Sequence, residues 1–335
     1  MANHISQLLE QWLAEKDQLE WVLATIIATE GSSYRKPGAM MFINSLGQYF
    51  GLLSGGCLEA DIMQKSRQCL DDGHNRVVVY DMQDEDDMAW QLGIGCGGKV
   101  TILLQPILAS NEFLHLPALY AALNNGRTVR YIQDVRPEQA GRNIVVEANA
   151  TVFNNKDYFS SIQTPPIRLA VFGGGVDARP LAAMANVLGW QVTLVDHRTG
   201  YAREQYFPNC YRYIKQSPET LSGEEWLQSL DAVVILTHNV TQDAQALRLV
   251  QCSSANYIGL LGPTHRTEQV LTAANLSRGQ LSKPLWNPVG LGLGGELPES
   301  IALSITAEIH KEYYAAVGGS LTEQLGMGKH ANKDQ

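Results

Sequence analysis

The spacing of apolar residues changes several times along the first 110 residues, and each change marks a new predicted element. Apolar residues recur every three to four positions in "MANHISQLLEQWLAEKDQLEW", which predicts an amphipathic helix at about 3–16. Continuous apolar runs bounded by glycine and polar residues predict strands instead. The predicted elements that follow are a strand at 21–30, a hairpin made of "AMMFIN" and "YFGLLS", a helix from Leu58 to about Gly73, the strand "RVVVYD" and a strand after "GIGCGG".

Residues 106–164 have a less regular pattern. "LHLPALYAALNN" predicts a helix, whereas "TVRYIQDV" and "NIVVEANATVF" predict strands. The polar, proline-containing stretch "NNKDYFSSIQTPP" predicts a linker. The sequence therefore predicts a mixed α/β domain at 1–110, connecting strands and a linker at 111–165, a second domain at 166–312 and a C-terminal tail at 313–335.

The second domain begins with "IRLAVFGGGVDARPLAAMANVLGWQVTLVDHR", in which a strand, a glycine turn, a helix and a second strand follow one another. This order predicts a Rossmann-like parallel sheet. Gly173 suits the tight turn and Gly175 lets the backbone approach a phosphate. Asp196 lies where a ribose hydroxyl would be, which favours NAD over a 2′-phosphorylated nucleotide. The alternative is a degenerate Rossmann domain that keeps its glycines for packing alone.

Two later stretches of this domain are also candidates for ligand binding. His238 and Asn239 follow the strand "DAVVILTHN", and the carboxyl ends of parallel strands line the crevice where such folds bind ligands. The alternative is that "HNVTQD" only caps the next helix. The glycine loop in "NPVGLGLGGELPES" enters a helix, whose first N–H groups can hold an anion or be capped locally.

Composition narrows the class of protein. The chain has 335 residues, of which 45% are hydrophobic and 18% charged, so it has enough apolar surface for two folded domains. The formal charge of −9 without a basic block argues against nucleic acid or an anionic membrane as the partner. No apolar run approaches a membrane span, and the N-terminal helix lacks the pattern of a signal peptide. Five cysteines without disulfide or zinc spacing predict a reduced, cytoplasmic location.

Six motifs together resemble one known family. In chain order they are "GSSYRKPGAMM", "GLLSGGCLEADI", "LGIGCGG", "VFGGGVDARPLA", "YIGLLGPTHR" and "PVGLGLGGELPESIALSITAEI". The chain thus resembles the XdhC/CoxI family of molybdenum-enzyme accessory proteins from about residue 10 to 312. The resemblance implies an N-terminal XdhC/CoxI domain and a C-terminal Rossmann domain. It also implies that the protein binds molybdenum cofactor (molybdopterin), holds it while a cysteine desulfurase supplies a sulfido ligand, and delivers it to a xanthine dehydrogenase-type apoenzyme. A homodimer is expected as well.

The resemblance directs attention to the N-terminal glycine loops. Molybdopterin is anionic, so backbone N–H donors and cations suit it, and a cysteine thiolate is a soft ligand for the metal or a carrier of its sulfur. We expect Cys57 and Cys96 to bind the metal and to converge with Arg35 and Lys36. The expected cofactor-binding residues are Arg35, Lys36, Ser54, Gly55, Gly56, Cys57, Cys96, Gly97 and Gly98. The alternative is two buried cysteines in separate tight turns beside an exposed basic turn.

Departures from the family pattern affect the C-terminal domain. The turn reads Gly173, Gly174, Gly175, Val176, Asp177 where the family often has "GAGHVA", and Asp177 would repel a pyrophosphate at the helix start. Which nucleotide binds, NAD or another, is therefore left open. The expected residues for it are Gly173, Gly175, Asp196 and His238. The alternative function is an NAD(P)-dependent oxidoreductase, for which His238 is the candidate acid–base residue; for an accessory protein we expect no catalytic residue.

Overall fold

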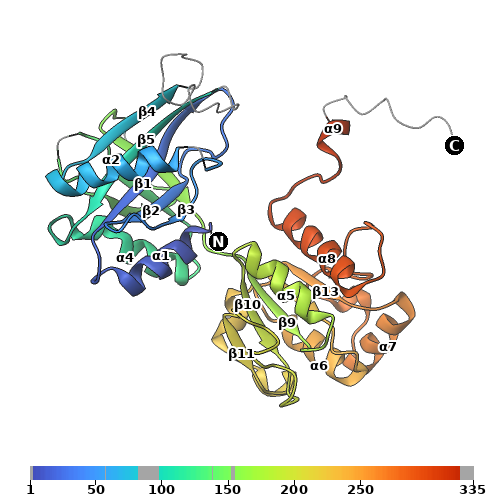
Figure 1. Cartoon of the computed structure of the whole chain (residues 1–335). Helices are drawn as coiled ribbons and strands as arrows, with labels where there is room; N and C mark the ends of the chain where they lie inside the picture. Colours follow the sequence, from blue (N-terminus) through green and yellow to red (C-terminus); the bar gives the residue numbers. More distant parts are fainter. Residues whose placement is uncertain (1–2, 57, 82–97, 138, 152–154, 325–335) are drawn as a thin grey trace. The chain divides into compact units, whose positions relative to one another are not determined.

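The computed structural model describes residues 3–56, 58–81, 98–137, 139–151 and 155–324. The chain divides into two compact units, Met1–Pro166 and Ile167–Gln335. Each unit has its own sheets and its own hydrophobic core (Figure 1). No helix of the described ranges is long and apolar enough to cross a bilayer.

The first unit is built on a five-stranded antiparallel sheet in the order β3-β2-β1-β5-β4, beside a three-stranded sheet in the order β7-β6-β8. Its helices and strands are α1 (Ile5–Glu15), β1 (Trp21–Glu30), β2 (Met40–Asn44), β3 (Tyr49–Gly51), α2 (Glu59–Asp72), β4 (Arg76–Asp81), β5 (Lys99–Ile107), the 3-10 helix Ala109–His115, α4 (Leu116–Asn124), β6 (Val129–Asp134), β7 (Ile144–Glu147) and β8 (Tyr158–Gln163).

Both faces of the larger sheet are covered, because successive residues of its central strand enter different cores. On β1, Trp21 and Leu23 pack with α1 and α4, whereas Val22 and Ala24 pack with α2. Side chains of a strand alternate between the two faces of a sheet, so a strand buried on both faces is apolar throughout. This explains the continuous apolar run "WVLATIIA" at the start of the strand.

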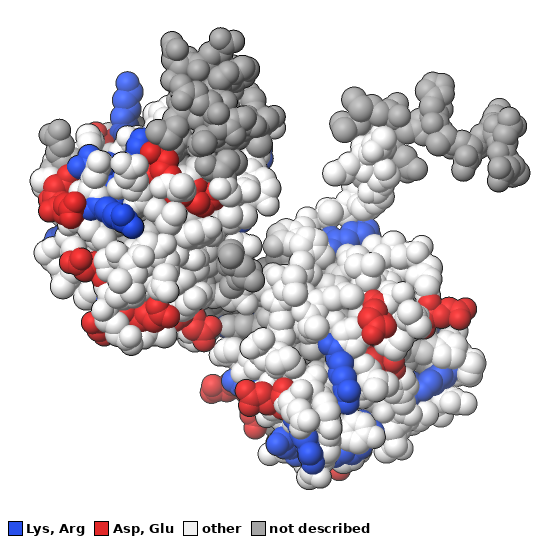
Figure 2. Space-filling view, in the orientation of Figure 1, with Lys and Arg blue, Asp and Glu red and all other residues white. Residues whose placement is uncertain are grey.

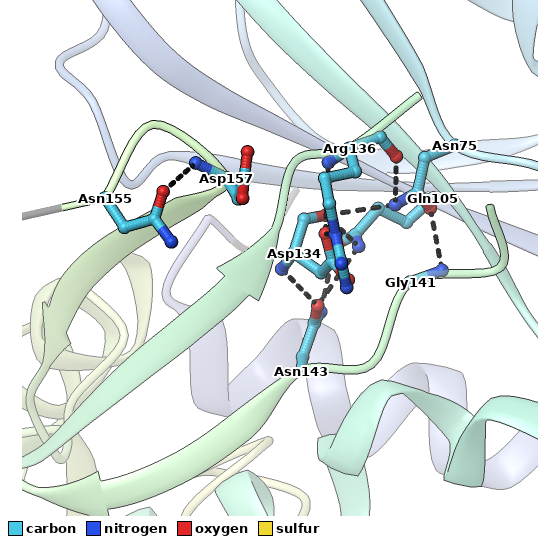
Figure 3. A network of polar contacts seen from close by, with 8 residues as sticks. All are labelled: Asn75, Gln105, Asp134, Arg136, Gly141, Asn143, Asn155 and Asp157. Carbon is cyan, nitrogen blue, oxygen red and sulfur yellow. Dashed lines mark hydrogen bonds and ion pairs between the residues drawn. The ribbon is translucent and has the colours of Figure 1, made fainter. Parts of the chain in front are cut away.

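Buried amide side chains join the two sheets of this unit, and Figure 3 shows part of their network. Nε2 of Gln133 on β6 donates to Oγ1 of Thr25 on β1 at 3.0 Å. Nε2 of Gln105 on β5 donates to Oδ1 of Asn143 at 3.0 Å, and Asn143 donates back to Gln105 at 2.9 Å. Leaving a buried amide without a partner costs about 1–3 kcal/mol, so this network fixes how the smaller sheet lies against the larger. Asn75, Tyr131 and Asp134 are its other buried members.

The second unit contains a six-stranded parallel sheet in the order β11-β10-β9-β12-β13-β14. The chain runs outward from β9 to β11 and then returns to β12, which is the strand order of a Rossmann fold. Helices α5 and α8 pack on one face, and α6 and α7 on the other. The elements are β9 (Arg168–Phe172), α5 (Ala178–Val187), β10 (Gln191–Val195), β11 (Arg212–Ile214), the 3-10 helices Pro218–Leu221 and Glu225–Ser229, β12 (Ala232–Ile235), α6 (Val240–Val250), β13 (Tyr257–Leu260), α7 (Thr264–Ala274), the 3-10 helix Arg278–Gln280, β14 (Leu285–Trp286), α8 (Pro298–Tyr313) and α9 (Leu321–Gln324).

The predicted fold class is confirmed, since an antiparallel α/β unit precedes a parallel Rossmann-like sheet. One local prediction was wrong. The stretch "NNKDYFSSIQTPP", predicted as a linker, contains β8, which pairs with β6 from Tyr158↔Asp134 to Gln163↔Val129. β8 is an edge strand in which Ser160, Ser161 and Gln163 interrupt the apolar residues, so it lacks the pattern by which a strand is predicted.

Charged side chains are distributed evenly over the visible surface. On the face shown in Figure 2, acidic and basic side chains are interspersed on each unit, and the described residues form no continuous basic patch there.

Candidate functional site

The loops predicted to hold a cofactor begin at one edge of the larger sheet of the first unit. The strands are antiparallel, and the register pairs Glu30 with Lys99, Asp81 with Lys99, and Met41 with Gly51. The carboxyl ends of β1, β3 and β4 therefore lie at the same edge as the amino ends of β2 and β5. Topology alone brings the loops "GSSYRKPG" and "SGG" and the residue Gly98 to this edge.

Gly98 shows that two of these loops touch. A Cβ at Gly98 would lie 2.1 Å from the backbone oxygen of Ser32 and 2.7 Å from that of Glu30. Such distances leave no room for a side chain, so the glycine is required by the close approach of two backbones. Cys57, Cys96 and Gly97 lie outside the described residues, and the expected convergence of the two thiols stays a prediction.

The "SGG" loop is fixed to the start of α2 by a buried carboxylate. Glu59 accepts hydrogen bonds from the backbone N–H of Ser54 at 3.0 Å and from its hydroxyl at 2.5 Å, and both residues are buried. Ser54 thus anchors the loop. Gly56 has φ +107°, which favours glycine, but no atom would lie within 4 Å of a Cβ at Gly55 or Gly56. The surface beside Gly55 is therefore open to a ligand.

The neighbouring basic turn supplies charge and a free hydroxyl. Arg35 is half-buried and Lys36 is exposed. Oγ of Ser33 is buried and has no hydrogen-bond partner among the residues that the structure describes, which is unusual for a buried hydroxyl. Open glycine backbone, two cations and an orphaned hydroxyl fit an anionic pterin. Within the described ranges, no group of three His, Cys, Asp or Glu side chains could hold a metal ion.

Two other cysteines are unsuited to bind a metal as thiolates. Sγ of Cys69 donates to the backbone oxygen of His74 at 2.9 Å, and burial raises the pKa of this thiol to about 12. Burial also raises the pKa of Cys210 to about 11. Both side chains therefore remain thiols at neutral pH. Cys252 is exposed.

In the second unit, the three glycines of the turn after β9 have different roles. Gly173 has φ +115°, and a Cβ there would lie 2.6 Å from the backbone oxygen of Leu236. A Cβ at Gly174 would lie 3.1 Å from the backbone of Tyr201. Gly175 has no atom within 4 Å of the same position. Packing and φ require glycine at Gly173, a side chain at Gly174 would be tight, and Gly175 leaves its backbone open to a ligand.

Asp196 is bonded on both of its carboxylate oxygens. Its Oδ2 accepts the N–H of Gly174 at 2.7 Å, and the guanidinium of Arg198 binds Oδ1 at 2.9 Å and Oδ2 at 2.6 Å. Burial opposes ionisation, but the hydrogen bonds from Arg198 and Gly174 outweigh it and hold the pKa of Asp196 below its ordinary value. The carboxylate expected to meet a ribose is thus a charged group inside the protein.

His238 lies on the same edge of this sheet, after β12. Its Nε2 is 2.7 Å from Oδ2 of Asp177, the residue that precedes α5. His238 has φ +59°, which is costly for a residue with a Cβ. Asn239 accepts the N–H of Gln242 at 3.1 Å and is the N-cap of α6, as the capping alternative predicts for this residue.

A buried ion pair behind His238 holds this strained turn, and it was not predicted from the sequence. Asp243, which is 0% exposed, accepts the N–H of Thr237 at 3.1 Å and its hydroxyl at 2.5 Å. Nη2 of Arg266 at the start of α7 lies 2.5 Å from Oδ2 of Asp243. An acidic residue on the apolar face of a helix, "TQDAQAL", is the only local sign of this cluster.

A cavity of about 110 Å³ opens between the ends of β9, β10 and β12. The residues around it include Phe172, Asp196, Arg198, Gln216, Asn239 and Gln242. It lies where the strand order reverses, which is where doubly wound sheets bind ligands. The cavity contains Asp196, whereas His238 and Gly175 lie outside its lining.

These features define a class of protein in which an α/β unit with glycine loops at one sheet edge precedes a Rossmann unit with a crevice. A sequence profile described as the XdhC and CoxI family matches residues 14–81, and one described as the XdhC Rossmann domain matches 169–309. The chain is 32% identical over 314 residues to a protein of Bacillus subtilis (strain 168) described as a probable xanthine dehydrogenase subunit, covering 88% of this chain and 93% of that protein. The chain belongs to the XdhC and CoxI family, as its motifs suggest.

Two further comparisons agree with this assignment. The chain is 24% identical over 292 residues to the "molybdenum cofactor insertion chaperone PaoD" of Escherichia coli (strain K12), covering 86% of this chain and 82% of that protein. The crystal structure of a xanthine dehydrogenase from Bacillus halodurans matches with a TM-score of 0.77 at 31% identity, covering 96% of this chain and 99% of that one.

Proposed function

We propose that the chain is a cytoplasmic accessory protein that binds molybdenum cofactor and delivers it to a xanthine dehydrogenase-type apoenzyme. One relative is described as a molybdenum cofactor insertion chaperone and another as a probable xanthine dehydrogenase subunit. While bound, the cofactor receives its sulfido ligand from a cysteine desulfurase, and the carrier acts as a homodimer. The cofactor is cargo in this scheme, and the carrier's residues bind and orient it without turning over a free substrate.

The observation that carries the proposal is the contact of Gly98 with the backbone of Ser32. In this proposal Gly98 and the turn that bears Arg35 and Lys36 form one binding surface with the "SGG" loop, which begins at the same edge. Backbone N–H groups and cations in one place suit the phosphate and pterin of the cargo. Cys57 and Cys96 belong to the same loops, so their thiolates would bind the molybdenum or the sulfur destined for it.

The Rossmann unit supplies a second binding function in this proposal, that of a nucleotide. Open backbone at Gly175, the N-terminus of α5 and the cavity beside Asp196 support it. NAD and other nucleotides are candidates for this ligand. His238, which lies beside Asp177 at the start of α5, would contact its phosphates.

The proposal is tested by cofactor retention in a matched pair of glycine variants. Gly55→Leu fills the open surface beside the "SGG" loop, and Gly279→Leu fills equally open space in the second unit. We expect the molybdenum and oxidised-pterin fluorescence of purified protein to fall at least tenfold in the first variant and to stay unchanged in the second. Equal retention would place the cofactor elsewhere.

The thiols require a separate test. A protein with both Cys57→Ala and Cys96→Ala should retain little molybdenum and should fail to activate a molybdenum hydroxylase. If this double variant retains and delivers the cofactor normally, the two cysteines take no part in binding the metal or its sulfur. Purified protein that carries NAD(H) and no pterin would instead favour the alternative function, that of an NAD(P)-dependent oxidoreductase.

A further inference from the structure

The carboxylate of Asp196 has no vacant position for a ribose. Its Oδ1 accepts the backbone N–H and Nε of Arg198, both at 2.9 Å. Its Oδ2 accepts the N–H of Gly174 at 2.7 Å and Nη2 of Arg198 at 2.6 Å. A carboxylate accepts about four hydrogen bonds, and all four come from the protein here. The side chain of Asp196 is only 2% exposed, so a ribose hydroxyl would have to displace Arg198.

The guanidinium of Arg198 is held rigidly by this arrangement. It lies 3.6 Å from the centre of the Tyr201 ring, at stacking distance. The backbone of Tyr201 lies close to Gly174, because a Cβ at Gly174 would be 3.1 Å from it. The two side-chain hydrogen bonds to Asp196 and the stacking on Tyr201 together fix the plane of the guanidinium.

The cavity of about 110 Å³ touches Arg198 but not Tyr201. Arg198 therefore both contacts the Tyr201 ring and lines the cavity. An engineered cavity of about 150 Å³ holds one benzene molecule in another protein, so this smaller cavity has room for part of a base, with the rest of the base outside it. Gln216 and Gln242 bring amide groups to it, which can donate to or accept from the edge of a base.

We propose that the cavity binds the base of a nucleotide on Arg198, and that Asp196 positions Arg198 without contacting the ribose. This inference rests on the proposed nucleotide binding of the second unit and specifies how the nucleotide is recognised. Guanidinium planes stack on bases of any identity, whereas an acidic residue in a Rossmann site selects a ribose through its hydroxyls. The site therefore recognises base and phosphate and is indifferent to the 2′-hydroxyl.

The test measures binding of ATP, CTP and their 2′-deoxy counterparts to the purified full-length chain by calorimetry. In the unaltered protein, each ribonucleotide and its deoxy counterpart should bind within about twofold of each other. Arg198→Ala should weaken all four at least tenfold, the scale of a lost stacking partner. The same substitution frees the carboxylate oxygens of Asp196 that Arg198 occupies. The variant should therefore bind each ribonucleotide at least fivefold more tightly than its deoxy counterpart. Arg212→Ala, which removes an arginine near Tyr211 outside the cavity, is the control and should change nothing.

Each contrary result has its own meaning. A tenfold preference of the unaltered protein for ribonucleotides would place the ribose on Asp196 and would overturn this inference alone. Unchanged nucleotide binding by the Arg198→Ala variant would show that the base does not stack on Arg198, and it would also overturn this inference. If none of the four nucleotides binds, this inference fails. The proposed nucleotide binding fails as well only if NAD, titrated in the same way, does not bind either, and cofactor retention by the first unit is measured independently.

Discussion

Nε2 of His238 lies 2.7 Å from Oδ2 of Asp177, and this contact joins the end of β12 to the start of α5. The carboxylate points to the imidazole and makes no capping bond to the helix. The N–H groups at the start of α5 therefore have no acidic cap that would compete with an anion. The sequence predicts repulsion from Asp177, whereas the structure gives this residue a partner.

Changing His238 separates backbone strain from the ion pair. His238→Gly and His238→Ala both remove the imidazole, but only glycine adopts φ +59° without strain. We expect the glycine variant to exceed the alanine variant by about 1 kcal/mol in the free energy of unfolding, measured with urea. The exposed pair with Asp177 contributes at most about 1 kcal/mol, so the glycine variant should match or exceed the unaltered protein. Equal stability of the two variants would show that the turn relaxes around alanine.

Substitution of two glycines of one turn by alanine should have different effects, on stability at Gly173 and on nucleotide binding at Gly175. Gly173→Ala forces a Cβ against the backbone of Leu236 at a positive φ, and we expect it to lower the free energy of unfolding by at least about 2 kcal/mol. Gly175→Ala meets no atom within 4 Å and should cost under about 1 kcal/mol, yet it should weaken nucleotide binding, because the methyl group occupies the open approach. Urea denaturation and calorimetry measure the two effects. Full binding by Gly175→Ala would leave this glycine without a ligand role.

The pair of Asp243 and Arg266 should be the most costly to break in the second unit. Asp243→Ala leaves a largely buried guanidinium without its partner and removes two bonds from Thr237. Breaking a buried pair in this way costs about 3–5 kcal/mol. Glu312→Ala removes the exposed partner of Lys311 and should change stability by less than about 1 kcal/mol. Similar losses in both variants would mean that the Asp243 cluster is solvated.

His4 should make the stability of the first unit depend on pH. Its Nδ1 accepts the N–H of Ser6 as the N-cap of α1, and burial lowers its pKa from 6.5 to about 4. The unfolded chain thus binds more protons between these values, so stability is complete above about pH 6.5 and falls as the pH drops toward 4. The loss is at most about 3 kcal/mol.

Asparagine provides the control for this effect. His4→Asn retains a good N-cap that does not titrate, so the difference in unfolding free energy between the two proteins should grow as the pH falls. A constant difference from pH 7 to 4 would contradict the role of His4.

The sequence predicts the elements whose signals are local. The apolar run before Gly173, the glycine turn and the second strand occupy neighbouring positions, and the parallel sheet follows from their order. Contacts between distant residues could not be predicted in this way. Gly98 gives no sign that Ser32 is its neighbour, and Asp177 gives none that its partner is His238, 61 positions away. These relations depend on loop conformations that packing decides.

The buried amide network also sets the order in which the first unit can be completed during synthesis. Thr25 and Gln133 are 108 positions apart, and Gln105 has its partner at Asn143. A nascent chain that has reached residue 110 has all the strands of the larger sheet but lacks the partners for these buried groups. Such long-range contacts slow folding. The segment 14–81, which carries the family profile, is therefore not a folding unit that could be transplanted alone.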